Sequence, residues 1–209
     1  EQDPDRIAAG RRLAARGVDY VVVDDGFQHR RLHRDVDLVC LDAERPFDRV
    51  LPAGLQREPS SGLSRASAVV LTRADRLDAA ALVEREAAIR RIAGRGVPVY
   101  PCVHAPLDVL ARPGGEVQPL EALRGRAVLL VSAIARPATF ADAVGRLGAR
   151  VVAHAVFGDH HRFALTELER LACEAQLRDA VLLMTEKDAV KLAGDAPPHL
   201  VLRIALRFF

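Results

Sequence analysis

The chain of 209 residues contains only two lysines, Lys187 and Lys191, although lysine and arginine together number 30. Because both lysines lie in one short segment near the C-terminus, the sequence has no phosphate-binding loop of the form G-x-x-x-x-G-K-S/T. No apolar run reaches the roughly 18 residues that a membrane-spanning helix needs, and no signal peptide is recognisable. The net charge of +2 gives no indication of nucleic-acid binding.

Cysteine and methionine are also scarce. The three cysteines, Cys40, Cys102 and Cys173, lie far apart and form no C-x-x-C pair, which favours reduced core thiols over a metal or redox site. The only methionine is Met184, and the sequence starts at Glu1 without an initiator. We therefore expect this chain to be a fragment or a processed product.

Short apolar runs that alternate with helical segments predict an α/β fold built on a parallel sheet. The β-branched run at 18–23 predicts a strand that is buried on both faces. The remaining expected strands are at 36–41, 68–71, 97–100, 127–133, 150–156, 180–184 and 200–204, and the expected helices are at 5–16, 79–93, 137–147, 165–178 and 186–193.

Proline and glycine are concentrated in residues 105–125, which favours an interdomain connection there. We accordingly divide the chain into a first domain at 1–124 and a smaller α/β domain at 125–209. Ligands of open α/β sheets bind beyond the carboxyl ends of the strands. The polar residues that follow the expected strands are therefore the candidates for a functional site.

The first candidate is the segment V-V-V-D-D-G-F-Q-H at 21–29, in which three valines run into Asp24 and Asp25. An aspartate in this position could hold Mg²⁺ at the phosphates of a nucleotide; the alternative is a turn with an acidic pair before a glycine. Gln28 and His29 add polar groups to the same loop. His33 follows His29 at a spacing that suits a metal on a helix, but the neighbouring arginines favour a solvated turn that faces phosphate.

The segment L-P-A-G-L-Q-R-E-P at 51–59 is the second candidate. Its prolines and glycine fix a loop, on which Arg57 could clamp a phosphate and Glu58 could reach a metal. A surface ion pair in a rigid turn is the alternative.

The third candidate is F-G-D-H-H-R-F at 157–163, directly after an expected strand. An acid beside a histidine orients the ring and stabilises its protonated form, so Asp159 with His160 or His161 could deprotonate a hydroxyl. A helix N-terminal region with incidental histidines would produce the same pattern.

The last candidate is M-T-E-K-D-A-V-K at 184–191. Thr185 is placed to cap a helix together with Asp188. Lys187 would then lie at the N-terminal end of that helix, where the helix dipole disfavours a cation. This placement is more plausible if Lys187 faces an anionic ligand.

These segments, in this order, resemble the tetraacyldisaccharide 4'-kinase family, and the resemblance extends from about Asp19 to Phe209. It implies a P-loop-NTPase-like parallel sheet followed by a smaller α/β domain. It further implies transfer of the γ-phosphate of ATP to the 4'-hydroxyl of a tetraacylated glucosamine disaccharide 1-phosphate in lipid A biosynthesis. The cofactors would be ATP and Mg²⁺, and the enzyme would be a monomer bound peripherally at the cytoplasmic face of the inner membrane.

The resemblance also implies roles for particular residues. Asp25 would be the Mg²⁺ ligand of a Walker B pair, with Glu58 near the metal, and His160 would be the histidine of the catalytic dyad, beside Asp159. The residues expected near the nucleotide are Asp24, Gln28, His29, Arg57 and Lys187, whereas no role follows for Asp188.

This chain departs from the family in lacking the P-loop and the acidic segment that supplies the aspartate of the dyad. We therefore expect the chain alone to be inactive, and its sheet to expose apolar surface. Two alternatives remain open at this point. One is a metal-dependent phosphoesterase that uses Asp24, Asp25, His29 and residues 159–161, and the other is a binding module without catalysis.

Overall fold

The computed structural model describes residues 3–192 and 194–209. The chain forms two compact units, which are Glu1–Val103 with Arg207–Phe209, and His104–Leu206. Two long strands, β3 (Val99–Arg112) and β8 (His199–Phe208), each contribute residues to both units. The units thus divide about twenty residues before the expected boundary at 124, and the assignment of residues 1–124 to a kinase domain stays a prediction.

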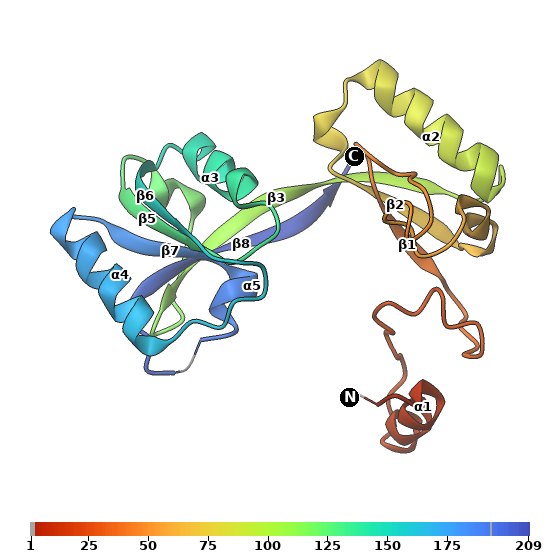
Figure 1. The fold of residues 1–209 in the computed structure, drawn as a ribbon, viewed down its shortest axis with the longest axis horizontal. Coiled ribbons are helices and arrows are strands. Elements are labelled where there is room, and N and C mark those ends of the chain that lie inside the picture. The colour runs from red at the N-terminus through yellow and green to blue at the C-terminus, as the bar shows by residue number, and fades with distance from the viewer. Residues whose placement is uncertain (1–2, 193) are drawn as a thin grey trace. The chain divides into compact units, whose positions relative to one another are not determined.

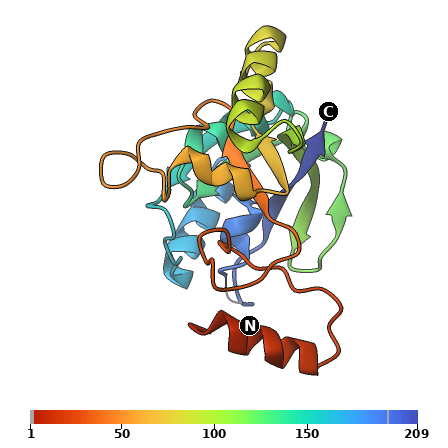
Figure 2. The same ribbon diagram turned by 90° about the vertical axis from the view of Figure 1, so that its right-hand side faces the viewer.

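The first unit is a small parallel sheet, in the order β1-β2-β3, with α2 packed on it (Figure 2). Helix α2 begins where the Asp78 carboxylate accepts a hydrogen bond from the Ala81 N–H, and it ends at Gly94, whose φ of 107° suits glycine. Its buried Ile89 packs against Val69 and Leu71 of β2. The elements are α1 (Arg6–Ala15), β1 (Leu38–Asp42), η1 (Ser60–Arg65), β2 (Ala68–Thr72), η2 (Ala74–Arg76) and α2 (Ala79–Ala93).

The expectation of a buried strand at 18–23 is wrong for this structure. The segment has no regular structure (Figure 2), and the side chains of Tyr20 and Val22 are 89% and 95% exposed. A strand requires hydrogen bonds to a neighbouring strand, and no segment that the structure describes pairs with these residues.

The second unit is a sheet in the order β3-β8-β7-β5-β6, with β4 paired to β3. All six residues of β5 are buried, because helices cover both faces of the sheet (Figure 1). Val128 and Leu130 pack on the side of α3, and Leu129 and Val131 pack on the side of α4. The elements are β4 (Val117–Gln118), η3 (Leu120–Leu123), β5 (Ala127–Ser132), α3 (Pro137–Arg146), β6 (Arg150–Val156), α4 (Leu165–Leu177), β7 (Val181–Thr185) and α5 (Glu186–Ala189).

Residues 105–125 do not form the expected connection between domains. They complete β3, turn at Gly114 and Gly115 into β4, and continue into η3. Val109 and Leu123 from this stretch are fully buried in the core of the second unit. The glycines serve a turn between paired strands, where their positive φ is needed, and not a flexible linker.

The other expected elements are present. Most of their ends shift by one or two residues, but β3 continues to Arg112, beyond the expected end at 100, and β8 continues to Phe208, beyond the expected end at 204. The last expected helix is reduced to the four residues of α5, and its predicted end at Ala193 lies outside the described residues. Among the residues that the structure describes, no helix has the length and apolar character to cross a membrane. Strands β5, β6 and β7 are parallel, so the segments that follow them all leave the sheet at the same edge. The polar residues of these segments therefore lie close together.

Candidate functional site

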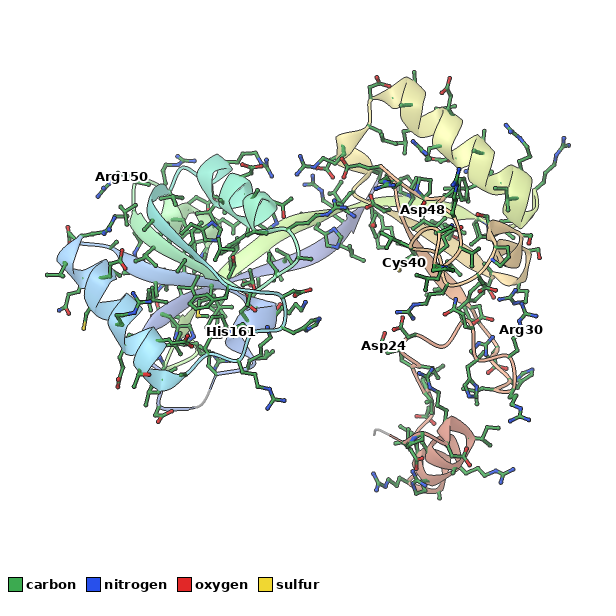
Figure 3. All side chains as sticks on the ribbon, in the orientation of Figure 1. Asp24, Arg30, Cys40, Asp48, Arg150 and His161 are labelled. Carbon is green, nitrogen blue, oxygen red and sulfur yellow. The ribbon has the colours of Figure 1, made fainter. Side chains whose placement is uncertain are left out.

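The acidic pair lies on an irregular turn, on which Figure 3 labels Asp24. Asp25 adopts a left-handed backbone conformation with a φ of 52°. Arg6 donates hydrogen bonds to the backbone oxygens of Asp24 and Asp25, at 3.3 and 3.1 Å. The Asp25 carboxylate stays 63% exposed and lies 3.1 Å from the guanidinium of Arg57. Asp25 and Arg57 therefore present a carboxylate and a guanidinium to solvent side by side.

Glu58, in contrast, is held by several donors. Nη2 of Arg65 donates to its two carboxylate oxygens at 3.0 and 2.8 Å, and the Gln28 amide donates at 3.0 Å. Burial raises the pKa of Glu58, but the hydrogen bonds from Arg65 and Gln28 outweigh that effect and leave the pKa below its ordinary value. Glu58 is consequently ionised, and both of its carboxylate oxygens already accept hydrogen bonds.

The structure brings the two sequence motifs of the first unit together. Arg57 reaches Asp25, Gln28 reaches Glu58, and the guanidinium of Arg65 lies 4.5 Å from the centre of the Phe27 ring. Sequence reasoning missed Arg65, because it belongs to no motif and is one arginine among many. Its contacts with both motifs make it the residue that joins them.

His29 lies behind this turn and is half-buried. Its Nδ1 is buried without a hydrogen-bond partner among the described residues. Arg34 holds the following segment by donating to the His29 carbonyl oxygen at 2.7 Å and to both oxygens of Asp37. The described residues contain no group of three or more His, Cys, Asp or Glu side chains arranged for a metal, so the zinc alternative of His29 with His33 gains no support.

The two expected Mg²⁺ ligands differ in their availability. Asp25 has an exposed carboxylate that could take a hard cation. Glu58 does not fit in this conformation, since a metal would have to displace Arg65 from both oxygens. Its role as a ligand stays a prediction that requires this rearrangement.

The second unit contains a cluster of charged and histidine side chains. It consists of Asp159 and His160 on the loop after β6 and Lys187 on α5 after β7. Asp159 Oδ1 lies 3.2 Å from Lys187 Nζ, and Asp159 Oδ2 lies 3.7 Å from His160 Nε2. The hydrogen bond from Lys187 is the main cause that lowers the pKa of Asp159 below its ordinary value. The His160 side chain is 75% exposed and is therefore accessible to a substrate.

His161, which Figure 3 labels, occupies a different environment. Its ring stacks on Phe157 with centroids 4.7 Å apart and meets the edge of Phe163 at 5.2 Å. Its Nε2 lies 3.0 Å from Glu167, which also accepts the Ala164 N–H at the start of α4. Its aromatic contacts and its hydrogen bond to Glu167 thus indicate a structural role for His161. His160 is the more accessible of the two histidines, and the geometry favours it as the one that a substrate can reach.

The motif at 184–191 is organised around Asp188, whose side chain is fully buried. Its carboxylate accepts hydrogen bonds from Lys191 at 2.8 Å, the Thr185 hydroxyl at 2.8 Å and the Ala133 N–H at 2.9 Å. The expected helix cap is confirmed, because the Thr185 side chain accepts the Asp188 N–H. The two lysines therefore differ, since Lys191 neutralises a buried acid and Lys187 faces the loop after β6.

A further pair that sequence reasoning missed lies beside this cluster. The hydroxyl of buried Ser132, at the end of β5, lies 2.8 Å from Nε2 of His154 in β6. Burial lowers the pKa of His154 below its ordinary value. The Ser132 carbonyl oxygen accepts the Phe157 N–H, which fixes the start of the loop that carries Asp159.

The largely parallel α/β sheet matches that of a solved structure, and this match identifies the fold as P-loop-NTPase-like. The chain is similar to the crystal structure of LpxK from Aquifex aeolicus in complex with ATP, with a TM-score of 0.63 and 27% sequence identity over 88% of this chain and 52% of that one. The model of the Tetraacyldisaccharide-1-P 4'-kinase family matches residues 2–208, and the chain belongs to this family.

Curated relatives agree with this assignment. The chain is 46% identical over 183 residues to the tetraacyldisaccharide 4'-kinase of Anaeromyxobacter sp. (strain Fw109-5), a match that covers 85% of this chain and 48% of the relative. The corresponding enzyme of Geobacter sulfurreducens is 39% identical, with 84% and 47% covered. The chain thus spans about half the length of the curated relatives it matches.

Proposed function

We propose that this chain forms the Walker B part and the C-terminal unit of an ATP-dependent kinase. The kinase would phosphorylate the 4'-hydroxyl of a tetraacylated glucosamine disaccharide 1-phosphate in lipid A biosynthesis. The observation that carries the proposal is the match of residues 2–208 to a family named for this reaction. The ATP in the similar structure from Aquifex aeolicus supports ATP as the phosphate donor.

The residues divide the chemistry between them. His160 would accept the proton of the attacking hydroxyl, because its ring is exposed and lies beside the Asp159 carboxylate. Arg57 would stabilise negative charge on the transferred phosphoryl group. Asp25 would hold Mg²⁺, which supplies charge neutralisation at the phosphates when it is bound.

Further properties of the proposed kinase rest on the family alone. We place the enzyme peripherally at the cytoplasmic face of the inner membrane, because its acceptor is a lipid precursor. We further propose that it is a monomer, as the family resemblance implies. The absence of a membrane-spanning helix from the described residues is compatible with that placement and does not establish it.

A fusion tests the proposal. The part of the relative from Anaeromyxobacter sp. (strain Fw109-5) that lies outside the match would be joined to residues 1–209, and transfer of the ATP γ-phosphate to the disaccharide would be measured. We expect activity from the fusion, none from the chain alone, and a loss of about 100-fold or more from Asp25→Asn in the fusion.

The same assay separates the competing functions. An inactive fusion that folds would overturn the proposal. Phosphate release from a phosphomonoester by the chain alone, with Mn²⁺ and without ATP, would establish the phosphoesterase instead. Binding of ATP or lipid by the fusion without turnover would favour the non-catalytic module.

A further inference from the structure

The side chain of Lys187, at the N-terminal end of α5, has a specific ion-pair partner. Its Nζ is 3.2 Å from Oδ1 of Asp159, a residue 28 positions earlier in the chain. The contact joins α5 to the loop after β6. Both side chains remain accessible, with exposures of 50% for Lys187 and 37% for Asp159. Because both side chains are solvated, the ion pair adds little to the free energy of unfolding. Its main effect is to fix the positions of the two side chains.

The short helix α5, which carries Lys187, is fixed by hydrogen bonds to a buried side chain. The neighbouring Asp188 is buried and accepts three hydrogen bonds, one of them from the backbone of Ala133 at the end of β5. The loop that carries Asp159 is tied to the same strand end, because the Phe157 N–H donates to Ser132. Lys187 on α5 and Asp159 on the loop after β6 are thus anchored at two adjacent residues, Ala133 and Ser132, at the end of β5.

Asp159 in turn controls His160. Its Oδ1 accepts the backbone N–H of His160 at 3.0 Å, and its Oδ2 faces Nε2 of the ring at 3.7 Å. The backbone of His160 has a φ of 63°, a left-handed conformation that is uncommon for residues other than glycine. The hydrogen bond from its N–H to Asp159 contributes to holding this conformation.

We propose that Lys187 is a positioning residue, which fixes the Asp159 carboxylate so that its second oxygen faces the His160 ring. The role rests on the proposed function, in which His160 is the base. Without Lys187, Oδ1 of Asp159 would lose one of its two hydrogen bonds, and the His160 ring would lose its fixed orientation toward the acceptor hydroxyl. A displacement of about 1 Å in such a group lowers the rate about 100-fold.

The test compares Lys187→Gln with Lys187→Arg in the kinase fusion. We expect Lys187→Gln to lower kcat about 10- to 100-fold with KM for ATP unchanged, and Lys187→Arg, which retains a cation, to restore most of the rate. Arg150→Gln is the matched control, because it removes one exposed positive charge at the opposite end of β6. It should leave kcat unchanged.

Hydrogen exchange of the His160 amide supplies a readout that needs no activity. In the chain as it stands, Lys187→Gln should accelerate this exchange about tenfold without lowering the stability of the unit, because the amide loses a fixed acceptor. Unchanged exchange and unchanged kcat would overturn the positioning role while leaving an active fusion, and so the proposed function, intact. A wild-type fusion without phosphate transfer would instead overturn the proposed function and this role with it.

Discussion

The Asp188 carboxylate accepts a hydrogen bond from the backbone N–H of Ala133, which lies 55 positions earlier in the chain. This contact ties α5, which follows β7, to the end of β5. It also explains why the acid in the motif at 184–191 is buried. The charge is satisfied by Lys191 and by two neutral donors, so the acid stabilises the fold.

Replacement of Asp188 by asparagine should destabilise the second unit. Asparagine cannot neutralise Lys191, whose side chain is 20% exposed, so we expect a loss of about 2–3 kcal/mol, which is below the value for a fully buried pair. Urea denaturation measures the difference. Asp142→Asn, an exposed acid on α3, is the control and should stay within about 0.5 kcal/mol of wild type. Equal stabilities for the two variants would contradict this account of Asp188.

The two lysines should react differently with an amine-acylating reagent. Lys187 is half exposed, whereas Lys191 is bound to a buried carboxylate. Acylation requires an amine that the reagent can reach. We therefore expect Lys187 to be modified at least about tenfold faster than Lys191 in the folded chain, as measured by peptide mass spectrometry. In Asp188→Asn the difference should shrink. Faster modification of Lys191 in the wild type would show that its contact with Asp188 does not form.

Gly62 should be intolerant of a side chain. A Cβ at this position would lie 2.7 Å from Oε2 of Glu58, and the carboxylate is held in place by Arg65. We expect Gly62→Ala to break these contacts and destabilise the first unit by about 1–3 kcal/mol, which thermal unfolding would reveal. Gly96→Ala, where a Cβ meets nothing within 4 Å, is the control. Two variants of equal stability would show that Glu58 can move without loss.

His154 should make the second unit less stable in acid. Burial lowers the pKa of His154 in the folded state below its ordinary value of 6.5, so the unfolded chain binds the proton more readily. The stability is therefore complete above pH 6.5 and falls as the pH drops from 6.5 toward the lower, folded value.

His154→Gln should remove this part of the pH dependence, although it also loses the hydrogen bond to Ser132. His104→Gln, which changes an exposed histidine, should keep the wild-type dependence. Denaturant unfolding between pH 5 and 8 makes the comparison. A wild-type pH dependence in His154→Gln would assign the effect to another group.

Much of the local structure could be predicted because its causes lie close together in the chain. The apolar runs that became β5 and β6 were recognisable from their composition, as was the cap by Thr185 at α5. The segment at 18–23 has the same composition and yet forms no strand. Strand formation depends on a hydrogen-bonded neighbour, which no local pattern supplies.

The candidate site shows the same division. The sequence by itself determined the family, because its motifs place particular side chains in short, fixed arrangements. Only the tertiary structure decided which residues meet: Lys187 with Asp159, Lys191 with Asp188, and Arg65 with Glu58. It also separated exposed His160 from His161, which is packed between aromatic rings. The physical reason is that charges and rings pair through space across distant segments, whereas sequence patterns report only on neighbours along the chain.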